Sequence, residues 1–156
     1  MRHGSASGAR GFSLLEMVLV LALVALASLL AAAAMTGGFD GMRLRSAAKE
    51  VAAQLRFTRA QAIATGEPQC FTLDPAAHRW TAPKSRSGEL PRQLGISVVA
   101  AREVQPAAGE GAIVFFADGA STGGRVRLAL DDVAWDVDVA WLTGEVRAAP
   151  VAERGR

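Results

Sequence analysis

The sequence predicts an α+β fold in which a long N-terminal helix, apolar enough to span a membrane, precedes a small antiparallel β-sheet or β-sandwich head. An apolar run of helix-forming residues begins at Phe12, and a one-sided apolar pattern then continues to Thr65. From Gln69 onward, apolar and polar residues alternate between turn signals. The 156 residues suit one globular domain rather than two full-sized ones.

Composition excludes several classes of function. Apolar residues make up 51% of the chain and charged residues 21%, which excludes a disordered chain. The single cysteine, Cys70, excludes an internal disulfide and a zinc site built from several thiolates. Two of the 17 basic residues lie in the first eleven positions, so the rest of the chain balances its 15 acidic residues. This neutrality argues against nucleic acid or an anionic membrane surface as an electrostatic partner.

The first expected element is the apolar helix of residues 12–35, which only Ser13, Glu16 and Ser28 interrupt. Leucine, alanine and methionine dominate it, and they favour helix. As a helix it is about 36 Å long, enough to cross a hydrocarbon core of about 30 Å. We therefore expect it to span a membrane.

A secretory signal peptide and a simple signal anchor are the alternatives for this segment. A signal peptide has a shorter apolar stretch before a small-residue cleavage site, which the AAAAM at residues 31–35 imitates. In a simple signal anchor, a carboxylate near the start of the apolar segment would have no function. Glu16 costs several kcal/mol in apolar surroundings unless a cation or donor meets it. Its presence favours a specific function for that carboxylate.

The string GFSLLE at residues 11–16, followed by the apolar helix, resembles the class III signal of type IV pilins and type II secretion pseudopilins. The resemblance implies that prepilin peptidase cleaves between Gly11 and Phe12, that Phe12 is then N-methylated, and that Glu16 becomes the fifth residue. The apolar helix would stay in the product. The released α-amine is a cation, and in a filament Glu16 of a neighbouring subunit would offset its burial. We interpret Glu16 as an assembly residue.

The expected helix then becomes amphipathic. The glycines within residues 37–41 each cost about 1 kcal/mol relative to alanine, which makes a local bend or melted stretch plausible, with Asp40 capping the restart. Gly66 and Pro68 end the helix. One apolar face recurs at helical spacing, formed by Leu44, Ala48, Val51, Leu55 and Ala62. This alanine-rich face suits packing onto a sheet better than lying on a membrane.

Basic residues lie mostly off that face: Arg43, Arg45, Lys49, Arg56 and Arg59. A nucleic-acid site is one interpretation of them. Glu50 lies among them, however, and such cations usually form a solvated surface. The sequence therefore favours the solvated surface.

The head is expected to be a series of short strands. Residues 69–74 and 79–82 predict a hairpin around a turn at residues 74–76, and residues 83–91 predict a loop. Residues 96–100 and 113–116 predict strands, the second apolar on both faces and therefore central. A last strand is expected at residues 145–148.

The clearest alternation lies between these last segments. Large apolar residues occupy every second position and predict one core face: Val133, Trp135, Val137, Val139 and Trp141. Val126, Leu128 and Leu130 repeat the pattern, with Arg125 and Arg127 facing outward. Arg127 is positioned to pair with an aspartate across strands.

Three stretches resemble the GspH and FimT group: LRFTRAQAIATGEP at 55–68, FFADGASTGGRVRL at 115–128 and WLTGEVR at 141–147. The usual pattern has proline where this chain has Ala117 and arginine where it has Glu145, and neither change threatens the fold. The resemblance implies a pilin-like fold and a minor pseudopilin of the GspH type, a structural subunit of the pseudopilus tip that supports export across the outer membrane.

The resemblance also implies the organisation of the chain. Residues 1–11 form the leader, 12–35 the transmembrane and assembly helix, 36–66 its amphipathic continuation, and 67–156 a periplasmic GspH-like head. The implied partners are other minor pseudopilins, the major pseudopilin, prepilin peptidase and inner-membrane lipid. The alternative is a FimT-like minor type IV pilin involved in pilus assembly or DNA uptake, for which Arg147, Arg154 and Arg156 are the only late basic cluster.

The third hypothesis is an enzyme anchored in the membrane, but the sequence shows no set of catalytic residues that would support it. Ser121 and His78 are not linked by any spacing, and the loop at residues 118–124 lacks the lysine of a phosphate loop. An acidic cluster suggests a calcium site, and it consists of Asp131, Asp132, Asp136 and Asp138. The EF-hand series is missing, however, so a solvated face is favoured for these residues. We therefore expect no catalytic residue, cofactor or metal, and we expect Cys70 to be a buried small hydrophobe.

Overall fold

A computed structural model of the chain describes residues 13–100 and 109–151, with the side chains of residues 32–39 left out. The chain divides into two compact units, Met1–Phe39 and Asp40–Arg156. Its elements are α1 (Leu14–Thr65), β1 (Gln69–Asp74), β2 (Arg79–Ala82), β3 (Arg86–Glu89), β4 (Gly95–Ala100), β5 (Gly111–Phe115), β6 (Gly124–Leu130), β7 (Val133–Val139) and β8 (Val146–Pro150).

In the described residues helix α1 begins at Leu14, and Ser13 caps it. The Ser13 Oγ accepts a hydrogen bond from the Leu15 N–H at 3.1 Å, which satisfies one of the free donors of the first turn. The helix is assigned without interruption to Thr65, so the glycines of residues 37–41 do not divide it. It ends as predicted at Gly66, whose φ of 69° turns the chain and whose N–H donates to the Ala62 carbonyl at 3.0 Å.

Within residues 13–100 and 109–151, eight strands form two antiparallel sheets, β3-β2-β1-β5 and β4-β6-β7-β8. The β1–β2 hairpin has the predicted bounds, because Asp74 Oδ1 accepts hydrogen bonds from the N–H groups of Ala76 and Ala77, both at 2.9 Å, and closes the turn. The antiparallel sandwich expected from the alternating pattern is confirmed.

Two predictions about the first sheet are wrong. The loop expected at residues 83–91 contains β3, which pairs with β2 although its sequence, RSGE, has no alternation of apolar residues. The strand expected to be central, β5, lies at the edge of its sheet beside β1. Its residues are nevertheless buried on both faces, since strand β4 of the second sheet lies against it. A two-sided apolar strand indicates cover on both faces, but it does not indicate a central position.

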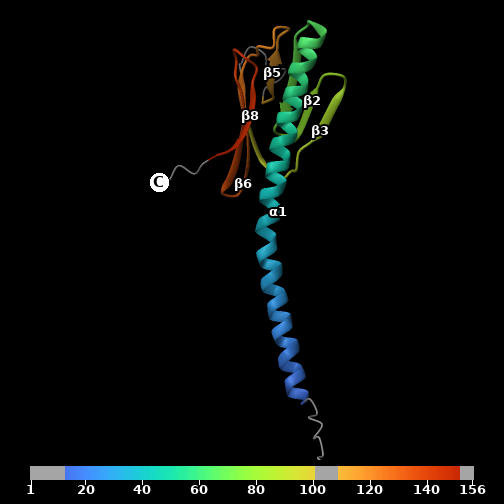
Figure 1. The fold of residues 1–156 in the computed structure, drawn as a ribbon, viewed down its shortest axis with the longest axis vertical. Coiled ribbons are helices and arrows are strands. Elements are labelled where there is room, and N and C mark those ends of the chain that lie inside the picture. Colours follow the sequence, from blue (N-terminus) through green and yellow to red (C-terminus); the bar gives the residue numbers. More distant parts are fainter. Residues whose placement is uncertain (1–12, 101–108, 152–156) are drawn as a thin grey trace, which may run out of the picture. The chain divides into compact units, whose positions relative to one another are not determined.

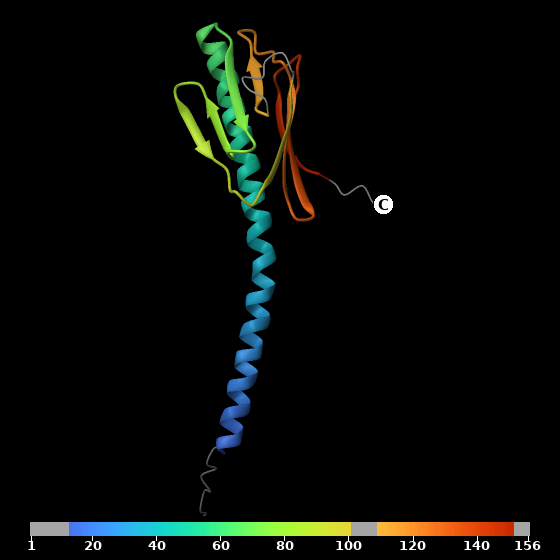
Figure 2. The same cartoon turned by 180° about the vertical axis from the view of Figure 1, so that it is seen from behind.

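The core of the Asp40–Arg156 unit lies between α1 and both sheets. In Figures 1 and 2 the β2–β3 hairpin lies to one side of the green part of α1, and strands β6 and β8 lie to the other. The predicted helix face is buried throughout, with Leu44, Ala48, Val51, Leu55 and Ala62 all 0% exposed. These side chains join Phe71, Leu73, Phe115, Val126, Leu128 and Val137 in one cluster.

The predicted core face of β7 is only partly buried. Val137 and Val139 belong to the core and Trp135 packs against it, but Val133 is 50% exposed and Trp141 is 68% exposed. The strand ends at Val139, so Trp141 lies in the following turn and no longer follows the alternation. The last strand, β8, begins at Val146 and runs to Pro150, slightly later than predicted.

Candidate functional site

The N-terminal half of α1 presents apolar side chains on every side. Leu14–Ala31 has a mean hydropathy of 2.7 and none of it is buried. Exposure of its large apolar side chains runs from 48% at Val20 to 87% at Leu14. A helix that is apolar all round is stable only where lipid or other protein surrounds it. By length and composition, this helix is long and apolar enough to cross a membrane.

Polar groups in this half are few. The Ser28 hydroxyl donates to the Val24 carbonyl of its own helix at 2.8 Å, so it needs no partner in apolar surroundings. Glu16 lies exposed in the first turn of α1. Its spacing from Ser13 is that of a capping box, a signal that identifies the true helix start. Gly11 and Phe12, the predicted cleavage residues, lie outside the described residues.

Two of the basic residues on α1 also bind backbone carbonyls of the head. Arg56 Nη2 donates to the Val146 carbonyl at 2.9 Å, and Arg59 Nε donates to the Gly119 carbonyl at 2.9 Å. Both bonds join residues that are far apart in the sequence. Arg56 is exposed and Arg59 half-buried, so the predicted solvated surface holds for Arg56, but the sequence did not predict these two bonds.

The β2–β3 hairpin is held to α1 by aromatic contacts. Trp80 Nε1 donates to Glu50 Oε1 at 3.0 Å, and the Arg86 guanidinium lies 4.3 Å from the centre of the Phe57 ring. Gly88 leaves room for the indole, since a Cβ there would lie 2.5 Å from Trp80 Cζ2. The short, polar strand β3 is thus placed by its contacts and not by its own propensity.

A close approach of two loops lies beside Arg59. Gly119, with a φ of 86°, belongs to the β5–β6 connection, and Gly144, with a φ of 62°, belongs to the β7–β8 connection. A Cβ on Gly144 would overlap the Gly119 carbonyl oxygen and would lie 2.9 Å from Arg59 Nε. Only glycine fits this position. These glycines belong to the ADG and LTG stretches that carry the resemblance to GspH and FimT.

The residues considered for catalysis have other partners. The buried Ser121 hydroxyl donates to the Ala140 carbonyl at 3.1 Å and accepts from the Gly123 N–H at 3.0 Å, so it fixes the loop. His78 Nδ1, in the β1–β2 turn, lies 3.2 Å from the carbonyl oxygen of Pro91 in the β3–β4 connection. Neither side chain is the partner of the other in these hydrogen bonds.

The acidic cluster is divided between cross-strand ion pairs and a turn. Arg127 binds Asp136 through two hydrogen bonds, 2.7 and 2.8 Å long, and Arg125 pairs with Asp138, which confirms the predicted cross-strand pairing. The hydrogen bond from Arg127 holds the pKa of Asp136 below its usual value. Asp131 and Asp132 are exposed in the β6–β7 turn. Arg154 and Arg156, from the late basic cluster, lie outside the described residues.

Cys70 is exposed, so its predicted burial is wrong. In β1, Phe71 and Leu73 point into the core, and alternation therefore places Cys70 on the outer face. Partial loss of water around the sulfur raises the pKa of the thiol.

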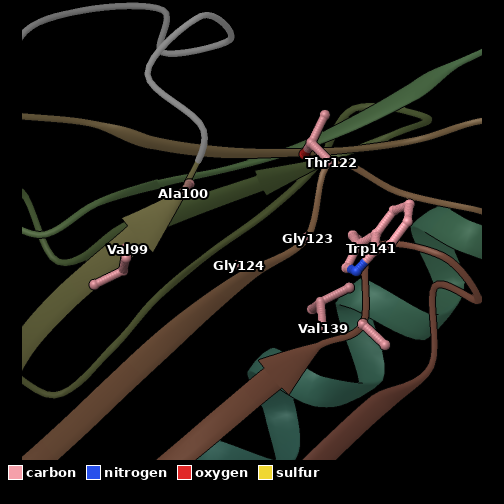
Figure 3. A pocket seen from close by; sticks show the side chains of 8 residues that line it. Val99, Ala100, Thr122, Gly123, Gly124, Val139 and Trp141 are labelled. Carbon is pink, nitrogen blue, oxygen red and sulfur yellow. The ribbon is translucent and has the colours of Figure 1, made fainter.

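Two of the grooves among the described residues of the head lie beside these loops. The first, about 410 Å³, lies between the end of β4 and the β5–β6 and β7–β8 connections. Figure 3 shows Trp141 beside Val139 at this groove, with Gly123 and Gly124 along it. Its lining is mostly apolar. The second, about 360 Å³, lies between α1 and the start of β8 and contains Arg56 and Arg59.

Comparison with known proteins identifies the family. A family model described as type II transport protein GspH matches residues 47–143. A protein of Xanthomonas campestris pv. campestris, named type II secretion system protein H, is 62% identical over 142 residues, covering 91% of this chain and 84% of the relative.

Two solved structures share the fold. The minor pseudopilin EpsH from the type 2 secretion system of Vibrio cholerae has a TM-score of 0.57 at 15% identity, over 69% of this chain and 97% of that one. The type IV minor pilin FimU of Pseudomonas aeruginosa has a TM-score of 0.55 at 14% identity, over 71% of this chain and 91% of that one. The predicted pilin-like α+β fold is confirmed, and the chain belongs to the GspH family of type II transport proteins.

Proposed function

We propose that this protein is a minor pseudopilin at the tip of a type II secretion pseudopilus, where it supports export of folded proteins across the outer membrane. The observation that carries the proposal is the helix Leu14–Ala31, which is apolar on every side and has no buried residue within its own chain. The 62% identity to a type II secretion system protein H supports the choice of the secretion machine over a pilus.

The apolar helix would have two functions, one before and one after assembly. Before assembly it would anchor the chain in the inner membrane with the head in the periplasm, and after assembly it would pack among the helices of other pseudopilins. For that sequence of events, prepilin peptidase would cleave between Gly11 and Phe12, and Phe12 would be N-methylated. Glu16 would then meet the α-amine of a neighbouring subunit. No catalytic step by this chain is part of the proposal.

Deletion of the gene in a strain with an intact secretion system tests the proposal. We expect exported enzymes to accumulate in the periplasm and to disappear from the culture medium, and we expect the full-length gene to restore export. The number of type IV pili on the cells is measured in parallel. Unchanged export together with a loss of pili would overturn the secretion assignment in favour of a pilus role.

A further inference from the structure

We propose that the groove between α1 and the start of β8 is a docking site for an acidic segment of a neighbouring pseudopilus subunit, whose carboxylate binds Arg56 and Arg59. This inference rests on the proposed function, because it takes the partner from the same filament. We refer to this groove, lined by Arg56, Arg59, Ala60, Ile63, Gly144, Glu145 and Val146, as the arginine groove.

Helical spacing places the α1 residues of the arginine groove on one face. Positions 56, 59, 60 and 63 recur at intervals of three and four residues, so their side chains line one wall together. The facing wall is the turn that leads into β8, and the space between them is about 360 Å³. A side chain with a short neighbouring segment fits a groove of this size.

Both arginines are already oriented by the fold. Each uses one N–H for a backbone carbonyl, Val146 for Arg56 and Gly119 for Arg59. A guanidinium carries several further N–H donors and cannot lose its charge. Among the described residues, neither guanidinium has an ion-pair partner. A ligand carboxylate would therefore meet cations whose rotamers are fixed beforehand, which lowers the entropic cost of binding.

The arginine groove contains one acidic residue, Glu145, which is close enough to feel the charge of Arg59 but forms its hydrogen bonds with Arg147. Glu145 accepts two hydrogen bonds from Arg147, at 2.9 and 3.1 Å. The groove consequently keeps an excess of positive charge, although the chain as a whole is nearly neutral. That local charge is complementary to a carboxylate.

Exposed apolar side chains lie on α1 and on the two connections beside the arginine groove. Ile63 is 50% exposed, Phe116 40%, Trp141 68% and Leu142 65%. Phe116 accepts a hydrogen bond from the Gly119 N–H at 2.9 Å, and the Trp141 carbonyl accepts one from the Ser121 N–H at 2.8 Å. Phe116, Trp141 and Leu142 thus belong to the β5–β6 and β7–β8 connections, whose Gly119 and Gly144 lie beside Arg59, and Ile63 lies on α1. Aromatic and aliphatic anchors beside fixed arginines are the composition of a protein interface.

This composition favours a protein over a nucleic acid. Nucleic-acid affinity needs several free cations along a surface. The nearby sheet arginines, Arg125 and Arg127, are bound to aspartates, and Arg147 is bound to Glu145. Two fixed cations next to apolar side chains suit a single carboxylate.

The test introduces a carboxylate into the arginine groove by substituting one of the residues that line it. Ala60→Glu puts an acid one helical turn after Arg56 and near Arg59, where it would occupy the groove itself, and glutamate is a good helix former. Ala60→Gln has the same shape without the charge. Ala53→Glu adds the same acid at another exposed position of α1, outside the groove. Each variant is made in the full-length chain, in cells that assemble the secretion system.

The measured quantity is photo-crosslinking from p-benzoylphenylalanine placed at Ile63, with the partner peptide identified by mass spectrometry. We expect a second pseudopilin subunit, crosslinked within a few residues of an aspartate or glutamate. We expect Ala60→Glu to reduce this crosslink about tenfold or more, while Ala60→Gln and Ala53→Glu retain it. Changing the partner's acid to its amide should reproduce the loss.

Other results would overturn the inference. These are a crosslink insensitive to Ala60→Glu, a partner segment without an acid, a crosslink only to nucleic acid or lipid, and no crosslink at all. A second crosslinker at Leu21 reports helix packing independently of the arginine groove. If Leu21 crosslinks to pseudopilins while Ile63 gives one of these results, only the docking site is wrong. If neither position crosslinks to a pseudopilin, the proposed function fails as well.

Discussion

The two halves of α1 are both apolar, yet they present their apolar side chains in opposite ways. In Leu14–Ala31 no residue is buried and the apolar surface covers the whole circumference. After Asp40, one face is fully buried, with Leu44, Val51 and Leu55 at 0% exposure. The distribution of apolar residues around a helix therefore indicates its partner: its own sheets for a one-sided helix, and lipid or other subunits for an all-round one.

Polar side chains in the two halves follow the same division. After Asp40, Glu50 and Arg56 bind groups of the head, namely the Trp80 indole and the Val146 carbonyl. In the first half, Glu16 is exposed and its proposed partner is the α-amine of another subunit. The first half should therefore matter for assembly and the second for folding. Four experiments follow, in decreasing order of expected effect.

Glu16→Ala should have the largest effect, and only on assembly. The neighbour's α-amine would be buried without its counter-charge, which costs about 3–5 kcal/mol and lowers incorporation into filaments about a hundredfold or more. Cleavage and membrane insertion should stay normal. The measurement is the fraction of the chain in sheared filaments. Ser28→Ala is the control, because the Ser28 hydroxyl bonds only to its own helix. Wild-type incorporation of Glu16→Ala would refute the pairing.

Leu55→Ala and Leu21→Ala make the same chemical change in the two halves. Leu55 is 0% exposed, so its truncation should lower the free energy of unfolding of the head by about 2–5 kcal/mol. Leu21 is 68% exposed, so its truncation should leave that free energy unchanged. Chemical unfolding of the full chain in detergent, followed by tryptophan fluorescence, measures both. An equal loss in the two variants would contradict the division of α1.

Gly144→Ala and Gly66→Ala compare two left-handed glycines of the head. Both variants carry a strain of about 1–2 kcal/mol, since φ is 62° at Gly144 and 69° at Gly66. Gly66 has open space around a new Cβ, but at Gly144 it would overlap the Gly119 carbonyl. We expect Gly144→Ala to cost about 1–3 kcal/mol more than Gly66→Ala in unfolding experiments. Equal losses would show that the two loops are not held in contact.

Acid should weaken the head slightly through Asp136. The pKa of Asp136 is lowered in the folded state by Arg127, so its contribution is present above the unfolded pKa, about 3.9, and is lost as pH falls through the folded value. The arginines are half-exposed and screened by water, which limits the effect to about 1 kcal/mol. Asp136→Asn should lower stability at pH 7 and not at pH 2. A loss of equal size at both pH values would point to packing instead.

Much of the fold could be predicted from local signals. The buried face of α1, its end at Gly66 and the β1–β2 hairpin follow from helical spacing, a glycine cap and an aspartate turn. The sequence did not predict β3, because its residues RSGE have no apolar alternation and the strand depends on Trp80 and on Arg86 over Phe57. It misplaced β5, since nothing local indicates that the next strand in the chain belongs to another sheet.

Side-chain roles were harder to predict than elements. Arg56 and Arg59 have the spacing of a solvated face, and only the tertiary fold places carbonyls of distant loops within their reach. Trp141 continues an alternating pattern, but the strand ends before it. The proposed processing residues, Gly11 and Phe12, rest on the motif alone. The sequence therefore indicates the apolar helix well and the arginine groove not at all.

The most direct test is the N-terminus of the chain purified from membranes, measured by intact mass and N-terminal sequencing. The account predicts that the chain begins at N-methylated Phe12, so that the apolar helix is retained, and that Gly11→Ala leaves the heavier precursor uncleaved. A chain that begins beyond Ala34 would contradict it, because the helix would then have been removed as a signal peptide.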